Sequence, residues 1–261
     1  MIKRMLLASI FAMIHQPVFA EHICDNMEML NIIDRPTFAR GVCVVPAKKS
    51  LLELGATHFK LLEQGESNEV GEGEYRFGLG RYTELDINPP NYYQQTVNPK
   101  AGFGYTTIGI KSIMFQNHFW AFSLDGALVP SGGSSYFGAR GLHGYINGIW
   151  FMDINEYLSH ALVVGYSTYG EYNMVEFEDF GSFNFDYSFS TKFNEHWVWF
   201  NEFYGQNKSH FDSGLGIIFS TGLIYLIHPQ VTLDIKFGQR VVGELNNSVN
   251  FIGIGGAMKF F

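Results

Sequence analysis

The sequence predicts an all-β protein, a closed antiparallel β-barrel of about twelve strands that crosses a membrane. Three observations predict this fold. Apolar and polar residues alternate strictly in several segments, the first twenty residues have the form of an export signal, and short turns alternate with long polar loops along the rest of the chain.

The alternation gives a predicted strand one apolar and one polar face, as in a strand between lipid and a lumen. In residues 183–193 the apolar face carries Phe183, Phe185, Tyr187 and Phe189. The opposite face carries Asn184, Asp186, Ser188, Ser190 and Lys192. The pattern returns at 231–238, where Val231, Leu233, Ile235 and Phe237 oppose Thr232, Asp234, Lys236 and Gly238.

Residues 1–20 predict a signal peptide that is cleaved after Ala20. Lys3 and Arg4 supply the positive start, and the apolar run Met5–Ile14 is too short to span a bilayer as a helix. An uncleaved membrane anchor is the alternative. Because the strands follow a signal peptide, we expect the protein in the outer membrane of a Gram-negative bacterium, in contact with lipid and lipopolysaccharide.

Composition agrees with a membrane barrel. The chain has 25 Phe, 14 Tyr and 29 Gly residues, and aromatic side chains suit bilayer interfaces while glycine suits tight turns. The formal net charge is −8, which makes nucleic acid an unsuitable partner because phosphate binding needs a basic surface.

Residues 21–49 lack the strand pattern and predict an N-terminal periplasmic extension or plug. Cys24 and Cys43 are the two cysteines of the chain, and in an oxidising compartment they predict a disulfide. The segment would either brace the barrel or close its mouth.

Residues 50–261 predict the barrel, with both chain ends at the periplasmic rim. The predicted strands lie near 50–62, 70–79, 84–93, 102–116, 119–129, 141–152, 157–168, 180–193, 196–205, 213–227, 230–240 and 249–261. The five short turns are 80–83, 117–118, 153–156, 194–195 and 228–229. The six long loops are 63–69, 94–101, 130–140, 169–179, 206–212 and 241–248. A soluble sandwich or lipocalin-like barrel is the alternative.

Two strands depart from simple alternation. Residues 141–152 and 157–166 have apolar side chains on both faces, including Ile146, Ile149 and Trp150. We therefore expect apolar side chains to fill part of the lumen there.

Two stretches resemble a known family. Leu226-Ile-His-Pro-Gln-Val-Thr-Leu-Asp-Ile-Lys-Phe-Gly238 followed by Asn250-Phe-Ile-Gly-Ile-Gly-Gly-Ala-Met-Lys-Phe-Phe261 is similar to the closing hairpin of the outer-membrane family associated with the meta-pathway of phenol degradation. Residues 31–46 resemble N-terminal extensions of some members. The resemblance implies an outer-membrane transporter. Lys259 departs from the terminal aromatic signature, so Phe260, in register with Ile252, Ile254 and Met258, is expected to face lipid. Phe260 and Phe261 would be recognised by the barrel assembly machinery.

Catalysis is the weaker interpretation. Ser209-His210 with Asp212, and Ser159-His160, are the candidates for a lipid hydrolase, but adjacent residues on a strand point to opposite faces. The nine His residues show no metal-ligand spacing, so no metal or other cofactor is expected.

The sequence thus predicts a passive channel for small solutes, including hydrophobic or aromatic ones, and no enzyme. A structural or adhesive barrel without an open pore is the alternative. The predicted lumen-lining residues are Glu74, Arg76, Asp125, Asn184, Asp186, Ser188, Lys192, Thr232, Asp234 and Lys236. Their mixed signs predict a pore with weak ion selectivity.

Overall fold

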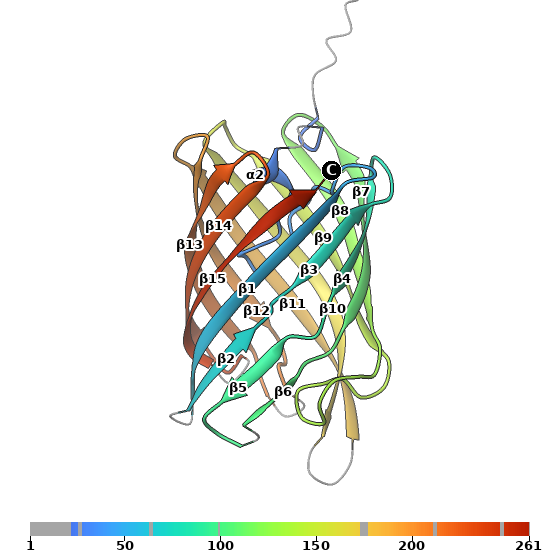
Figure 1. The fold of residues 1–261 in the computed structure, drawn as a ribbon, viewed down its shortest axis with the longest axis vertical. Coiled ribbons are helices and arrows are strands. Elements are labelled where there is room, and N and C mark those ends of the chain that lie inside the picture. The colour runs from blue at the N-terminus through green and yellow to red at the C-terminus, as the bar shows by residue number, and fades with distance from the viewer. Residues whose placement is uncertain are drawn as a thin grey trace, which may run out of the picture.

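The computed structural model describes residues 22–260 apart from 26–27, 63–64, 99, 173–176, 211–212 and 246–247. The predicted signal peptide, its cleavage after Ala20, and Phe261 lie outside the described residues. The described chain forms one closed antiparallel barrel around an N-terminal segment (Figure 1). Within these residues no helix is long and apolar enough to cross a membrane.

The barrel has twelve strand positions, nine of which hold one uninterrupted strand. These nine are β1 (Ser50–Leu61), β8 (Trp120–Val129), β9 (His143–Asp153), β10 (Leu158–Tyr172), β11 (Phe177–Lys192), β12 (Trp197–Gln206), β13 (Gly216–His228), β14 (Val231–Val242) and β15 (Ser248–Phe260). Three positions hold two collinear strands each. They are β2 (Glu66–Val70) with β3 (Glu74–Gly78), β4 (Thr83–Asn88) with β5 (Tyr92–Gln95), and β6 (Ala101–Phe103) with β7 (Thr107–Gln116).

Neighbouring positions pair antiparallel all the way around, and β1 closes the barrel on β15, in register from Ser50 opposite Phe260 to Lys60 opposite Asn250. Closure pairs the backbone N–H and C=O groups of every strand, which a lipid environment requires. The predicted twelve-stranded barrel is therefore confirmed.

Two predicted loops are wrong in extent. Residues 63–69 were expected as loop, but β2 begins at Glu66 and pairs with β1 and β5. Residues 169–179 were also expected as loop, but β10 and β11 stay paired as far as Tyr172 opposite Phe177. Both stretches are rich in polar side chains, and polarity is no obstacle to a backbone ladder that continues beyond the lipid.

The predicted alternation is confirmed by the exposure of the side chains. On β11, Phe183 and Tyr187 are exposed while Asp186 and Ser188 are buried. On β14, Leu233 and Phe237 are exposed while Thr232 and Asp234 are buried. On β15 the exposed set is Ile252, Ile254, Met258 and Phe260, as predicted for the lipid-facing register. The apolar residues thus form the outer wall and the polar residues point inward.

The N-terminal residues 22–49, called the inner segment below, lie inside the barrel (Figure 1). They include α2 (Met29–Ile32), and the predicted disulfide between Cys24 and Cys43 is present. The segment enters at the end with the short turns, where the Ile23 amide donates to the Asn117 carbonyl at 2.9 Å.

The core of the molecule lies between the inner segment and the barrel wall. Met29, Ile32, Val44 and Val45 are buried in one cluster with inward residues of eight strands. Those wall residues are Leu51, Ile113, Ala121, Ile149, Val163, Phe200, Ile224 and Ala257. Ile149 and Val163 are inward apolar residues of β9 and β10, so the expected apolar filling of the lumen is observed and its partner is the inner segment.

Candidate functional site

Asp34 of the inner segment lies at the centre of a buried ion network. Its Oδ1 atom is 3.2 Å from Arg76 Nη1 on β3 and 3.1 Å from Lys111 Nζ on β7. Arg76 and Lys111 also contact Glu84 on β4, at 2.8 and 3.1 Å. Burial would raise the pKa of Asp34, but the positive charges of Arg76, Lys111 and Arg40 outweigh burial and hold that pKa below its usual value.

Inward carboxylates also accept hydrogen bonds from the backbone of the inner segment. Glu53 accepts from the amides of Asp34 and Arg35, at 3.0 and 2.7 Å. Glu202 accepts from the amides of Phe38 and Ala39, at 2.7 and 2.9 Å, and Glu84 accepts from the Val45 amide at 2.6 Å. An irregular buried chain has no ladder to satisfy its amides, so these side chains take the place of a neighbouring strand.

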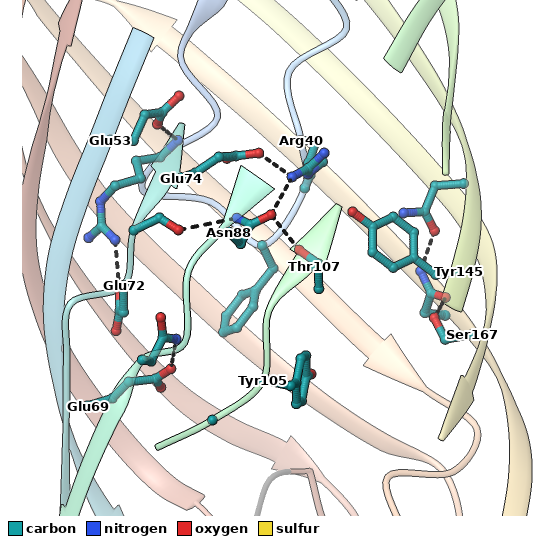
Figure 2. A pocket seen from close by; sticks show the side chains of 18 of the residues that line it. Arg40, Glu53, Glu69, Glu72, Glu74, Asn88, Tyr105, Thr107, Tyr145 and Ser167 are labelled. Carbon is teal, nitrogen blue, oxygen red and sulfur yellow. Dashed lines mark hydrogen bonds and ion pairs between the residues drawn. The ribbon is translucent and has the colours of Figure 1, made fainter. Parts of the chain in front are cut away.

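Arg40 connects the inner segment to three strands. Its guanidinium lies 3.1 Å from Asp86 on β4 and 3.1 Å from Asp125 on β8. It also contacts Glu74 on β3, as Figure 2 shows. The side chain is largely buried, so removing any partner would leave a charge with poor hydration.

Arg35 makes a second connection, which reaches β14 across the seam between β1 and β15. It lies 2.7 Å from Glu72, between β2 and β3, and 3.4 Å from Asp234 on β14. Lys236 Nζ is 3.6 Å from Glu72 and lies over the Phe38 ring, 5.6 Å from its centroid. The inner segment is thus held by ion pairs to strands around the barrel.

Two cavities occupy the lumen on either side of the inner segment. The long-loop cavity, about 460 Å³, is bounded by residues near the long-loop end, including Glu69, Asn91 and Tyr105 (Figure 2). The short-turn cavity, about 400 Å³, is bounded by turn residues including His118 and Asn155. Arg35, Ala39 and Arg40 line both cavities. The inner segment is therefore the partition between them.

The ten predicted lumen residues fall into three groups and one single residue, Thr232. Arg76, Glu74, Asp125 and Asp234 contact the inner segment directly. Lys236, Asn184 and Asp186 lie on the long-loop side, where Lys236 meets Glu72 and the other two line the cavity. Ser188 and Lys192 line the short-turn cavity, and Thr232 is buried.

Sequence reasoning missed seven inward charges of the barrel wall, which are Glu53, Glu69, Glu72, Glu84, Asp86, Lys111 and Glu202. The alternation contained the signal for them. Lys111, for example, lies next to the exposed Ile110 and is therefore placed inward by a period of two.

The candidate catalytic groups do not assemble in the described part of the chain. Ser159 lines the short-turn cavity, whereas His160 packs edge-on against Trp150 with ring centroids 5.3 Å apart. Ser209 Oγ donates to the Glu244 carbonyl at 3.0 Å. Asp212 lies outside the described residues.

A closed antiparallel barrel with a lipid-compatible outer wall and a polar lumen defines the class of outer-membrane β-barrels. Residues 33–247 match the model of the family described as "Putative MetA-pathway of phenol degradation", and the chain belongs to that family. The resemblance drawn from the closing hairpin and the N-terminal segment is thereby confirmed.

Solved structures share the fold at low sequence identity. The COG4313 outer membrane channel from Pseudomonas putida F1 is 9% identical, with a TM-score of 0.68 over 86% of this chain and 100% of its own. The KdgM porin is 11% identical, with a TM-score of 0.53 over 81% of this chain and 99% of its own. The NanC porin is also 11% identical, with a TM-score of 0.53 over 80% and 98%. No curated protein sequence matches the chain.

Proposed function

We propose that the protein is a passive outer-membrane channel for small solutes, and that the inner segment forms its constriction. The observation that carries the proposal is the pair of cavities that approach Arg35, Ala39 and Arg40 from opposite ends of the barrel. A lumen with a cavity on each side of the inner segment has the geometry of a channel with one constriction. A barrel whose only role is structural has no need of such hollows.

The charge of the lumen supports a preference for cations. Inward carboxylates outnumber inward cations, in contrast to the mixed signs expected from the sequence. The carboxylates include Asp34, Glu53, Glu69, Glu72, Glu74, Glu84, Asp86, Asp125, Asp186, Glu202 and Asp234. The cations are Arg35, Arg40, Arg76, Lys111, Lys192 and Lys236. A ring of one charge sign attracts the opposite ion into a pore.

Aromatic side chains support passage of small aromatic solutes. Phe38, Tyr93, Tyr105, Tyr145, Tyr169 and Tyr204 line the long-loop cavity. Flat rings present wide apolar contact area with a polar edge, which suits a partly polar aromatic molecule.

The membrane setting is part of the proposal. Membership of the family and the exposed apolar wall support an outer-membrane location, with lipid and lipopolysaccharide around the barrel. Phe260 is exposed at the end of β15, where the assembly machinery could bind it. The long loops would then lie outside the cell and the short turns in the periplasm.

A structural barrel without an open pore is the second candidate. The observation in its favour is the buried cluster that joins the inner segment to eight strands, because such packing stabilises a closed lumen.

Single-channel recording from the full chain in planar bilayers tests the proposal. We expect small, cation-preferring currents whose size increases when the ion pairs of the inner segment are weakened. Absence of current both in the wild type and in such variants would favour the structural barrel.

A further inference from the structure

The carboxyl group of Asp186 is buried beside that of Glu202, with no cationic partner among the described residues. Asp186 lies on β11, is 2% exposed, and lines the long-loop cavity. With both acids ionised, neither oxygen of Asp186 has a hydrogen-bond donor in the described part of the chain. Two buried carboxylates in contact cannot both stay charged at low cost, so such a pair holds either a shared proton or a cation.

By contrast, both oxygens of the neighbouring Glu202 carboxylate accept hydrogen bonds from protein donors. Glu202 on β12 accepts from the amides of Phe38 and Ala39 through one oxygen and from the Ser220 hydroxyl, at 2.7 Å, through the other. The Ala39 amide lies near both carboxylates, and its hydrogen bond of 2.9 Å goes to Glu202. The protein's own donors therefore serve Glu202, and Asp186 is left to share a proton with Glu202 or to accept from a bound cation.

Aromatic rings surround this site. Tyr204 is directly opposite Asp186 in the β11–β12 register, so the two side chains share the inward face. Phe38 stacks on Tyr204 with ring centroids 4.8 Å apart. Gln206 fixes the Tyr204 and Tyr169 hydroxyls by donating to them at 2.6 and 3.0 Å. Ring faces attract a cation within about 6 Å of their centroids.

The cations already present in the cavity wall serve other carboxylates. Arg35 pairs with Glu72 and Asp234, and Arg40 pairs with Asp86 and Asp125. The cavity of about 460 Å³ falls within the usual size range of small-molecule sites, about 300–1,000 Å³. A positively charged guest of that size would find the missing compensation at Asp186.

We infer that the long-loop cavity binds a small organic ammonium ion, with its N–H groups donating to Asp186 and its apolar part against Phe38 and Tyr204. The combination of a buried acid pair with fixed aromatic faces selects this class over neutral aromatics, which cannot replace the proton shared by the pair, and over anions. As a substrate class for the channel, the inference rests on the proposed function; as a binding site, it does not.

Calorimetry of the full chain in detergent with benzylammonium chloride as probe tests the site. Benzyl alcohol is the matched neutral ligand, and Asp179→Asn is the matched control variant because Asp179 is an exposed acid on the same strand. We expect benzylammonium to bind at least tenfold more tightly than benzyl alcohol. Asp186→Asn should reduce benzylammonium binding at least tenfold, Tyr204→Leu should weaken it, and Asp179→Asn should leave it unchanged.

Several results would overturn the inference. They are equal binding of the two ligands, equal binding by Asp186→Asn and the wild type, and displacement of the probe by potassium ions at equal concentration. The amide of Asp186→Asn can still donate to Glu202, so its thermal unfolding temperature should stay close to that of the wild type, which excludes misfolding as the cause of lost binding. Binding without conductance would support the proposed binding site and contradict the proposed channel function. Conductance without binding would contradict the binding site alone.

Discussion

Gly55 and Gly255 are paired across the seam where β1 meets β15, and the guanidinium of Arg35 lies over both. A Cβ atom at Gly55 would be 2.2 Å from Arg35 Cζ, and one at Gly255 would be 2.5 Å from Arg35 Nε. Two residues without side chains at the closing seam thus make room for the group that ties the inner segment to Glu72 and Asp234.

The first prediction follows from this contact. Gly255→Ala should displace the Arg35 guanidinium and lower stability by about 1–3 kcal/mol, the usual cost of overpacking. Gly80→Ala is the matched control because a Cβ there meets nothing within 4 Å. Thermal unfolding in detergent measures both, and equal stability of the two variants would contradict the close packing.

The second prediction concerns Arg40. Arg40→Gln leaves Glu74, Asp86 and Asp125 with fewer positive partners, so we expect a loss of about 3–5 kcal/mol and faster proteolysis of the inner segment. Arg81→Gln is the control, because Arg81 pairs with Asp25 at an exposed position and should have little effect. An Arg40 variant as resistant as the control would show that the ion pairs do not hold the segment.

The third prediction concerns pH. The folded pKa of Asp34 is lowered, so its ionised form contributes stability that is fully present above the unfolded value of 3.8 and is lost as the pH falls through the lower, folded value. The unfolding temperature should therefore decrease as the pH is lowered below about 4. In Asp34→Asn this decrease should be smaller. Identical acid profiles in the two proteins would contradict the assignment.

The sequence predicted the barrel well because the alternation is repeated in most of its strands. Alternation places Asp186 and Asp234 inward whatever the rest of the chain does. The inner segment has no such signal, since its position depends on contacts between Asp34, Arg35 or Arg40 and strands up to 199 residues away. The sequence also could not predict why inward acids such as Glu53 and Glu202 are needed, because their partners are backbone amides of the irregular inner segment.

The fourth prediction concerns the disulfide. Cys24→Ser with Cys43→Ser removes a cross-link between residues 19 positions apart. Such a cross-link lowers the entropy of the unfolded chain and so stabilises the folded state by about 3 kcal/mol. We expect the inner segment to become more accessible to protease while the barrel stays folded, as measured by gel shift in detergent. Unchanged protease resistance would mean that the ion pairs suffice to hold the segment.

The fifth prediction concerns topology. A cysteine introduced at Gly132, in the loop between β8 and β9, should react with a membrane-impermeant reagent on intact cells, whereas one at Glu195, in a short turn, should not. The native cysteines are both in the disulfide and provide a silent background. Labelling at Glu195 alone would invert the proposed orientation.

Conductance tests the central claim most directly, namely that the lumen is a path narrowed by the inner segment. Single-channel recordings under a salt gradient should show small cation-preferring currents in the full chain and larger currents with the same preference in Arg40→Gln. Complete absence of current in both proteins, with both correctly folded, would contradict the account and leave a barrel whose lumen is sealed.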